Sequence, residues 1–91
     1  MTYSIEYSKD VDKILKKWKK SSPTLFKKYC KLLEELMLHP RTGIGHPEPL
    51  IGGHDIRWSR HVTKYDRIIY DIFDNIVKVE IIQVEGHYND K

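Results

Sequence analysis

Residues 55–84 read DIRWSRHVTKYDRIIYDIFDNIVKVEIIQV, and polar and apolar side chains alternate along three parts of this segment. Alternation with a period of two is typical of β-strands that bury one face. It predicts strands over residues 55–62, 66–73 and 76–84, separated by short turns. Strands that follow one another through such turns pair as an antiparallel meander.

The chain before this segment predicts one more strand and two helices. Residues 2–7 also alternate, so we expect a short strand that joins an edge of the sheet. Residues 9–20 and 23–39 repeat apolar side chains at helical spacing, with Ser8 as an N-cap and Pro40 as a terminator. The expected fold is α+β: a two-helix hairpin packed on a twisted antiparallel sheet of about four to five strands.

Length and composition predict a single globular domain spanning residues 1–91, with 40% apolar and 32% charged residues. The one cysteine, Cys30, excludes an internal disulfide and fits a reducing compartment. Neither a signal peptide nor an apolar run of about 20 residues is visible. We therefore expect a cytoplasmic protein with no membrane partner.

Positive charge is concentrated in the first half of the chain. The net charge is only +3, but residues 9–31 hold nine lysines against two aspartates. A local excess of this size attracts polyanions such as RNA. A solvated helical face that binds nothing accounts for the same lysines, and the sequence leaves both interpretations open.

Three polar residues of the second half could carry acid–base chemistry. Glu48 lies between two prolines, which stiffen the segment that holds its carboxylate. Arg67 belongs to a predicted strand and is either an anion clamp or half of an ion pair with Asp71. His87 follows the last strand, where it is either a proton donor or an exposed terminal residue.

Together these residues supply the groups that RNA cleavage by its own 2′-OH requires. That reaction needs a base for the 2′-OH proton, a cation for the charge on the phosphate, and an acid for the leaving 5′-oxygen. The five histidines show no paired His/Cys spacing of the kind that binds zinc. We therefore expect neither a metal nor another cofactor.

Three separated motifs occur in a characteristic order: GHPEPL at 45–50, IRWSRHVTKYDRIIYDI at 56–72 and His-Tyr at 87–88. Over nearly its whole length the chain resembles the YoeB/Txe family of the RelE superfamily, which are bacterial type II toxins. The resemblance implies a microbial-ribonuclease-like fold and a ribosome-dependent endonuclease that cleaves mRNA in the ribosomal A site. It also implies inhibition by an antitoxin of the Phd/YefM type, and it allows a homodimer.

The resemblance assigns roles to individual residues. It implies that Glu48 is the general base, Arg67 the transition-state cation, His87 the general acid and Tyr88 the base-orienting aromatic residue. Further predicted contacts with RNA or ribosome come from three residues of the middle motif: Arg57, Arg60 and His61.

The chain departs from the family pattern at two positions. Ile51 stands where relatives often have lysine, and His61 stands where a second arginine is common. Both changes remove or weaken a phosphate-binding cation, so they bear on substrate affinity more than on acid–base chemistry.

Two other classes of function fit the same sequence. A ribosome-binding or RNA-binding inhibitor that blocks translation without cutting needs the basic surface but neither His87 nor Glu48. A structural subunit whose apolar groove receives a partner helix predicts no toxicity when the protein is expressed alone.

Overall fold

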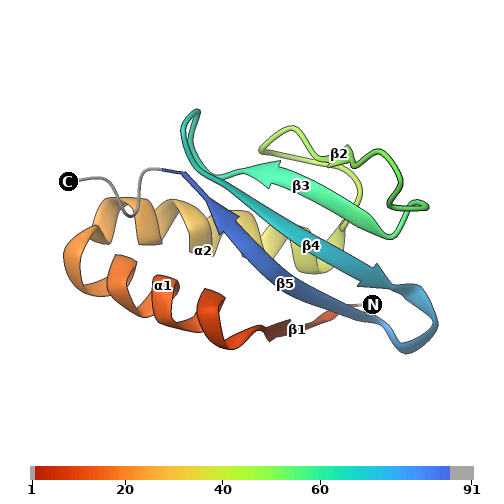
Figure 1. Cartoon of the computed structure of the whole chain (residues 1–91), viewed down its shortest axis with the longest axis horizontal. Helices are drawn as coiled ribbons and strands as arrows, with labels where there is room; N and C mark the ends of the chain where they lie inside the picture. The colour runs from red at the N-terminus through yellow and green to blue at the C-terminus, as the bar shows by residue number, and fades with distance from the viewer. Residues whose placement is uncertain (1, 87–91) are drawn as a thin grey trace.

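The computed structural model describes residues 2–86 and places five strands and two α-helices in two layers (Figure 1). The elements follow one another as β1 (Ser4–Tyr7), α1 (Lys9–Ser21), α2 (Pro23–Leu38), β2 (Glu48–Pro49), β3 (Arg57–His61), β4 (Arg67–Phe73), a 3-10 turn (Asp74–Ile76) and β5 (Lys78–Glu85). The predicted α+β class, the helical hairpin and the three-strand meander are confirmed. Within the described residues, no helix is long and apolar enough to cross a membrane.

The sheet has the order β1-β5-β4-β3-β2. All neighbouring strands are antiparallel except β1, which runs parallel to β5 with Ile5 opposite Val79. The expected first strand therefore joins the sheet, but it makes the sheet mixed rather than purely antiparallel. α1 continues from β1 in the direction of β5, and α2 runs back, so that its end lies beside the start of β1, where the Tyr3 N–H donates to the Met37 carbonyl at 2.8 Å (Figure 1).

The helices begin where their sequence signals lie. The Ser8 side chain accepts a hydrogen bond from the backbone N–H of Val11 at 3.3 Å, and Pro23 occupies the first turn of α2. Both helices cover the same face of the sheet (Figure 1), and their apolar sides meet β3, β4 and β5 in one core. Trp18 and Leu36 are completely or almost completely buried there.

A bulge in β5 sets which residues face the helices. Ile69 pairs with Gln83 and Tyr70 pairs with Ile81, so Ile82 is an extra residue on β5. With this bulge, Tyr70 and Ile81 both point into the core. The neighbouring pair, Ile69 and Gln83, points to the opposite face of the sheet. That second face carries no helix.

Candidate functional site

Glu48 lies on β2, a two-residue strand that the sequence does not predict. Glu48 pairs with Ser59 of β3, and the backbone N–H of His61 donates to the Gly45 carbonyl at 2.7 Å just before it. Gly45 has φ +82°, and a Cβ there would lie 2.5 Å from the His61 carbonyl oxygen, so only glycine fits. The prolines beside Glu48 suit an edge strand, where an N–H can be missing. The backbone that carries Glu48 is therefore fixed to the sheet.

Glu48 and Arg67 point to the face of the sheet that has no helix. Directly opposed residues of antiparallel strands share a face, and Glu48 is opposite Ser59 while Arg67 is opposite His61. Ser59 and His61 are two residues apart on β3, about 7 Å at the usual rise of a strand. The fold thus brings the predicted base and the predicted cation to neighbouring rows of one face. His87 and Tyr88 lie outside the described residues.

Arg67 forms an ion pair with Glu85, its register partner on β5. Arg67 Nε lies 2.7 Å from Glu85 Oε1, and both side chains are more than one-third exposed. The alternative of a salt bridge from Arg67 to Asp71 is wrong. Residues four apart on a strand are separated by about 13 Å, whereas cross-strand partners lie about 5 Å apart. Arg67 is therefore paired but still reachable from solvent.

Asp71 instead binds Arg57, on the same helix-free face. Arg57 Nε and Nη2 donate to the two oxygens of Asp71 at 2.8 and 3.0 Å. These hydrogen bonds raise the pKa of the Arg57 guanidinium above its usual range. A predicted RNA contact by Arg57 stays a prediction, and it would have to use the edge of the guanidinium that Asp71 leaves free.

Arg60 has a different position from the one predicted for it. Arg60 is 0% exposed and faces the helices, because it lies two residues after the core residue Trp58 on β3 and so points to the same face. Its Nη2 donates to the carbonyls of His39 and Thr42 at 2.6 and 2.7 Å. A contact between Arg60 and RNA is therefore contradicted by its burial.

The partners of Arg60 hold the end of α2 and the start of the following loop. Arg60 Nη1 lies 3.5 Å from Glu35 Oε1, and that carboxylate also accepts from the backbone N–H of Ile44. Arg60 Nε donates to the Tyr70 hydroxyl at 3.4 Å, which donates to the Pro40 carbonyl at 2.7 Å. Burial raises the pKa of the Tyr70 phenol. This buried network fixes the loop that leads to Glu48.

His61, the register partner of Arg67, borders a shallow pocket of about 460 Å³. The pocket is lined by Gly45, His46, His61, Val62, Thr63 and Lys64. The Nδ1 atom of His61 is buried, and nothing in residues 2–86 hydrogen-bonds to it. An RNA contact by His61 remains a prediction. In the same part of the chain, no three histidine, cysteine, aspartate or glutamate side chains are grouped as metal ligands.

The described chain ends next to Arg67. Gly86 has φ +150° and lies against the carboxylate of Asp66, so a side chain at position 86 would collide with it. Asp66 immediately precedes Arg67, and Gly86 immediately precedes His87. The end of the β4–β5 ladder is therefore the point from which the C-terminal residues continue.

Comparison with known proteins assigns the family. The model of YoeB-like toxins of bacterial type II toxin–antitoxin systems matches residues 7–88. The chain is 31% identical over 71 residues to the toxin YoeB of Streptomyces coelicolor, covering 78% of this chain and 82% of that protein. The chain belongs to the YoeB family of toxins.

Solved structures of YoeB toxins have the same fold. The YoeB/ParE toxin of Agrobacterium tumefaciens superposes with a TM-score of 0.79 at 26% identity, covering 93% of this chain and 99% of that one. A YoeB–YefM complex from Staphylococcus aureus gives a TM-score of 0.79 at 25% identity, covering 97% and 100%. A YoeB dimer from the same organism gives 0.81 at 24% identity with the same coverage.

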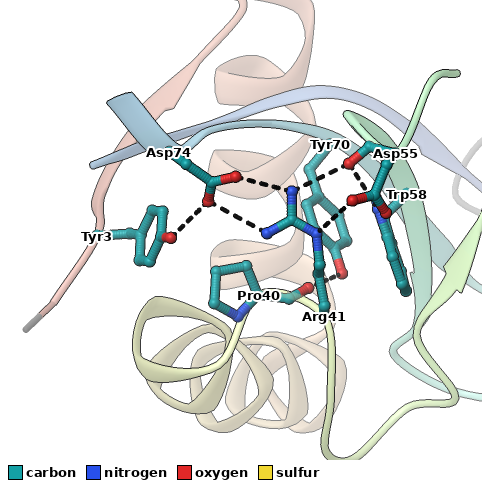
Figure 2. Close-up of polar contacts among 7 residues, drawn as sticks. All are labelled: Tyr3, Pro40, Arg41, Asp55, Trp58, Tyr70 and Asp74. Carbon is teal, nitrogen blue, oxygen red and sulfur yellow. Dashed lines mark hydrogen bonds and ion pairs between the residues drawn. The ribbon is translucent and has the colours of Figure 1, made fainter. Parts of the chain in front are cut away.

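In this YoeB family member, Arg41 fastens the loop before Glu48 to two other segments of the chain (Figure 2). Arg41 Nη1 and Nη2 donate to the two oxygens of Asp74 at 3.1 and 3.0 Å, and Nη2 also donates to the Asp55 carbonyl at 3.0 Å. The Tyr3 hydroxyl donates to Asp74 at 2.6 Å (Figure 2). Arg41 thus joins the loop after α2 to the segment before β3 and to the β4–β5 turn, and Asp74 extends the cluster to Tyr3, just before β1.

This cluster predicts an acid-sensitive contribution to stability. The hydrogen bonds from Arg41, and then that from Tyr3, hold the pKa of Asp74 below its usual value. A carboxylate with a lowered folded-state pKa stabilises the protein above its ordinary pKa of about 3.9, and this stabilisation is lost as pH falls through the folded pKa. We expect Asp74→Asn to lower the free energy of unfolding at pH 7 by under about 1 kcal/mol, because the pair is exposed.

Urea denaturation between pH 2 and 7 measures this effect. The difference between wild type and Asp74→Asn should shrink as pH falls below about 4. A Glu34→Gln control should keep a constant difference, since within residues 2–86 Glu34 has neither hydrogen-bond nor ion-pair partners. A difference that is independent of pH for Asp74→Asn would contradict the expectation.

Proposed function

We propose that this chain is the toxin of a type II toxin–antitoxin system and that it cleaves mRNA in the ribosomal A site. Membership of the YoeB family supports the first part. The second part is supported chiefly by the placement of Glu48 and Arg67 on the same helix-free face of the sheet, on the two strands that flank β3. A carboxylate and an arginine that flank one solvent-facing surface can act on the same phosphodiester.

In the proposed reaction, Glu48 takes the proton from the ribose 2′-OH, whose oxygen attacks the adjacent phosphorus. Arg67 stabilises the charge that grows on the non-bridging oxygens. His87 gives a proton to the departing 5′-oxygen, and the products are a 2′,3′-cyclic phosphate and a 5′-hydroxyl end. Tyr88 orients a base by stacking, and Arg57 and His61 contact the neighbouring backbone. These side chains complete the proton transfers without a cofactor.

The lysines of the helices have a separate role in this proposal. All nine lysines of residues 9–31 are exposed on or beside α1 and α2, which cover the face opposite to Glu48 and Arg67. They therefore cannot hold the RNA segment that is cut. We propose that they attract ribosomal RNA while the helix-free face meets mRNA, an attraction that added salt would screen.

We also propose a cognate antitoxin of the YefM type as the physiological inhibitor. A YoeB–YefM complex and a YoeB dimer are known for Staphylococcus aureus, with folds like that of this chain. A homodimer is accordingly part of the proposal. Action on ribosomes places the toxin in the cytoplasm.

Mapping of RNA 5′ ends after brief induction tests cleavage. New 5′-hydroxyl ends should appear within the reading frame of a reporter mRNA. They should be absent from a reporter that differs only in its start codon, because an untranslated message never enters the A site. Growth arrest without new ends would contradict cleavage and would support the non-cutting inhibitor instead.

A further inference from the structure

We propose that Glu85 is a positioning residue for Arg67: it binds one edge of the guanidinium and leaves the terminal nitrogens for the RNA phosphate. This inference rests on the proposed nuclease function. Glu85 is the direct partner of Arg67 across the β4–β5 ladder, and Arg67 Nε donates to Glu85 Oε1 at 2.7 Å.

A second contact decides how much of Arg67 the carboxylate occupies. Gln83, two residues earlier on β5, donates from Nε2 to Glu85 Oε2 at 2.9 Å. The two oxygens of Glu85 therefore serve different donors. Within residues 2–86, neither terminal nitrogen of Arg67 has an acceptor. Arginine has five N–H donors, so four of them stay available on Arg67.

Arg57, on the same face, shows how a carboxylate can occupy more of a guanidinium. Asp71 accepts from both Nε and Nη2 of Arg57, so its carboxylate binds the guanidinium in the two-pronged manner. In the Arg67–Glu85 pair, Gln83 binds the second oxygen of Glu85 instead. The two arginines are thus bound differently, through two nitrogens at Arg57 and through one at Arg67, because the residues around their carboxylates differ.

Folding stability does not account for the Arg67–Glu85 pair. Both side chains are more than one-third exposed, and ion pairs of that kind contribute little to stability. The pair nevertheless places a negative charge beside the proposed phosphate site, which opposes binding of RNA. What the pair provides is a fixed orientation of the Arg67 guanidinium. A guanidinium held through Nε cannot rotate about the side chain, so its terminal nitrogens point to one place.

Glu85→Ala should therefore separate binding from turnover. Without the carboxylate, Arg67 loses its orientation, and we expect kcat on mRNA-programmed ribosomes to fall by roughly 10- to 100-fold. KM should be unchanged or lower, because a repelling charge has been removed. Glu85→Gln should restore kcat to within about threefold of wild type, since an amide oxygen still accepts from Arg67 Nε.

Gln83→Ala examines the second contact. It frees the other oxygen of Glu85 to bind a terminal nitrogen of Arg67, as Asp71 does with Arg57. KM should then rise while the thermal midpoint stays constant. Glu34→Ala is the control, because it removes an exposed carboxylate of α2 that is remote from Arg67, and it should leave both kcat and KM unchanged.

Wild-type cleavage is the reference for all of these variants. If the wild type does not cut, the proposed function fails, whatever the variants do. If the wild type cuts and Glu85→Ala keeps its kcat, the positioning role is wrong. It is equally wrong if Glu85→Gln loses as much kcat as Glu85→Ala, or if both variants lose activity together with their thermal midpoint.

Discussion

An Arg60→Met variant is expected to lose about 3–5 kcal/mol of unfolding free energy, the usual cost of removing one partner from a buried charged network. Arg60 is 0% exposed, and its guanidinium satisfies the carbonyls of His39 and Thr42. Methionine fills much of the volume but donates nothing, so these carbonyls at the end of α2 lose their partner. The carboxylate of Glu35 loses its counter-charge in the same change.

Urea denaturation followed by circular dichroism measures the loss. Arg57→Met on the same strand is the control, and it should cost far less stability, because about half of the Arg57 side chain is exposed and solvent screens its ion pair with Asp71. An Arg60→Met protein with wild-type stability and weakened binding to ribosomes would restore the role in RNA contact. Domains are typically stable by about 5–15 kcal/mol, so a loss of this size is a large share of the total and moves the urea midpoint measurably.

Glu48→Gln and His87→Gln are each expected to lower the cleavage rate by about 10²–10⁴-fold, the usual contribution of one acid–base partner. The Glu48 carboxylate is exposed and has no side-chain partner among residues 2–86, so its replacement by an amide of the same shape leaves the fold intact. Stability and ribosome binding should stay at wild-type levels. The loss should therefore fall on kcat.

Single-turnover cleavage with saturating mRNA-programmed ribosomes isolates this step. Glu34→Gln, an exposed glutamate on α2, is the matched control and should cut at the wild-type rate. Glu48→Gln activity within tenfold of wild type would exclude Glu48 as the general base. The same result for His87→Gln would exclude it as the general acid.

The fold could be predicted from sequence wherever periodicity is regular and local. The meander and the two helices depend on patterns within about fifteen residues, and both are confirmed. β2 could not be predicted, because Pro47 and Pro49 flank Glu48 and two paired residues are too few for a pattern. The parallel pairing of β1 depends on contacts more than 70 residues apart, which no local signal encodes.

The candidate site was predictable in part. Alternation along β3 puts Arg60 on the same face as the buried Trp58, and it puts Arg57 on the other face. This alternation could have shown that Arg60 lies inside the protein. Glu85 was missed because its meeting with Arg67 depends on the bulge at Ile82. The doublet Ile81-Ile82 breaks the alternation of β5 and is the signal for that bulge.

The central position of β5 has a consequence for the timing of synthesis. β5 is the last strand in the sequence, yet it lies between β1 and β4, so β1 has no strand partner and β4 has only β3 until residues 78–85 have left the exit tunnel. Arg67 likewise meets Glu85 only then. A nascent chain therefore lacks the face that we propose to cut mRNA until β5 has emerged and paired with β4.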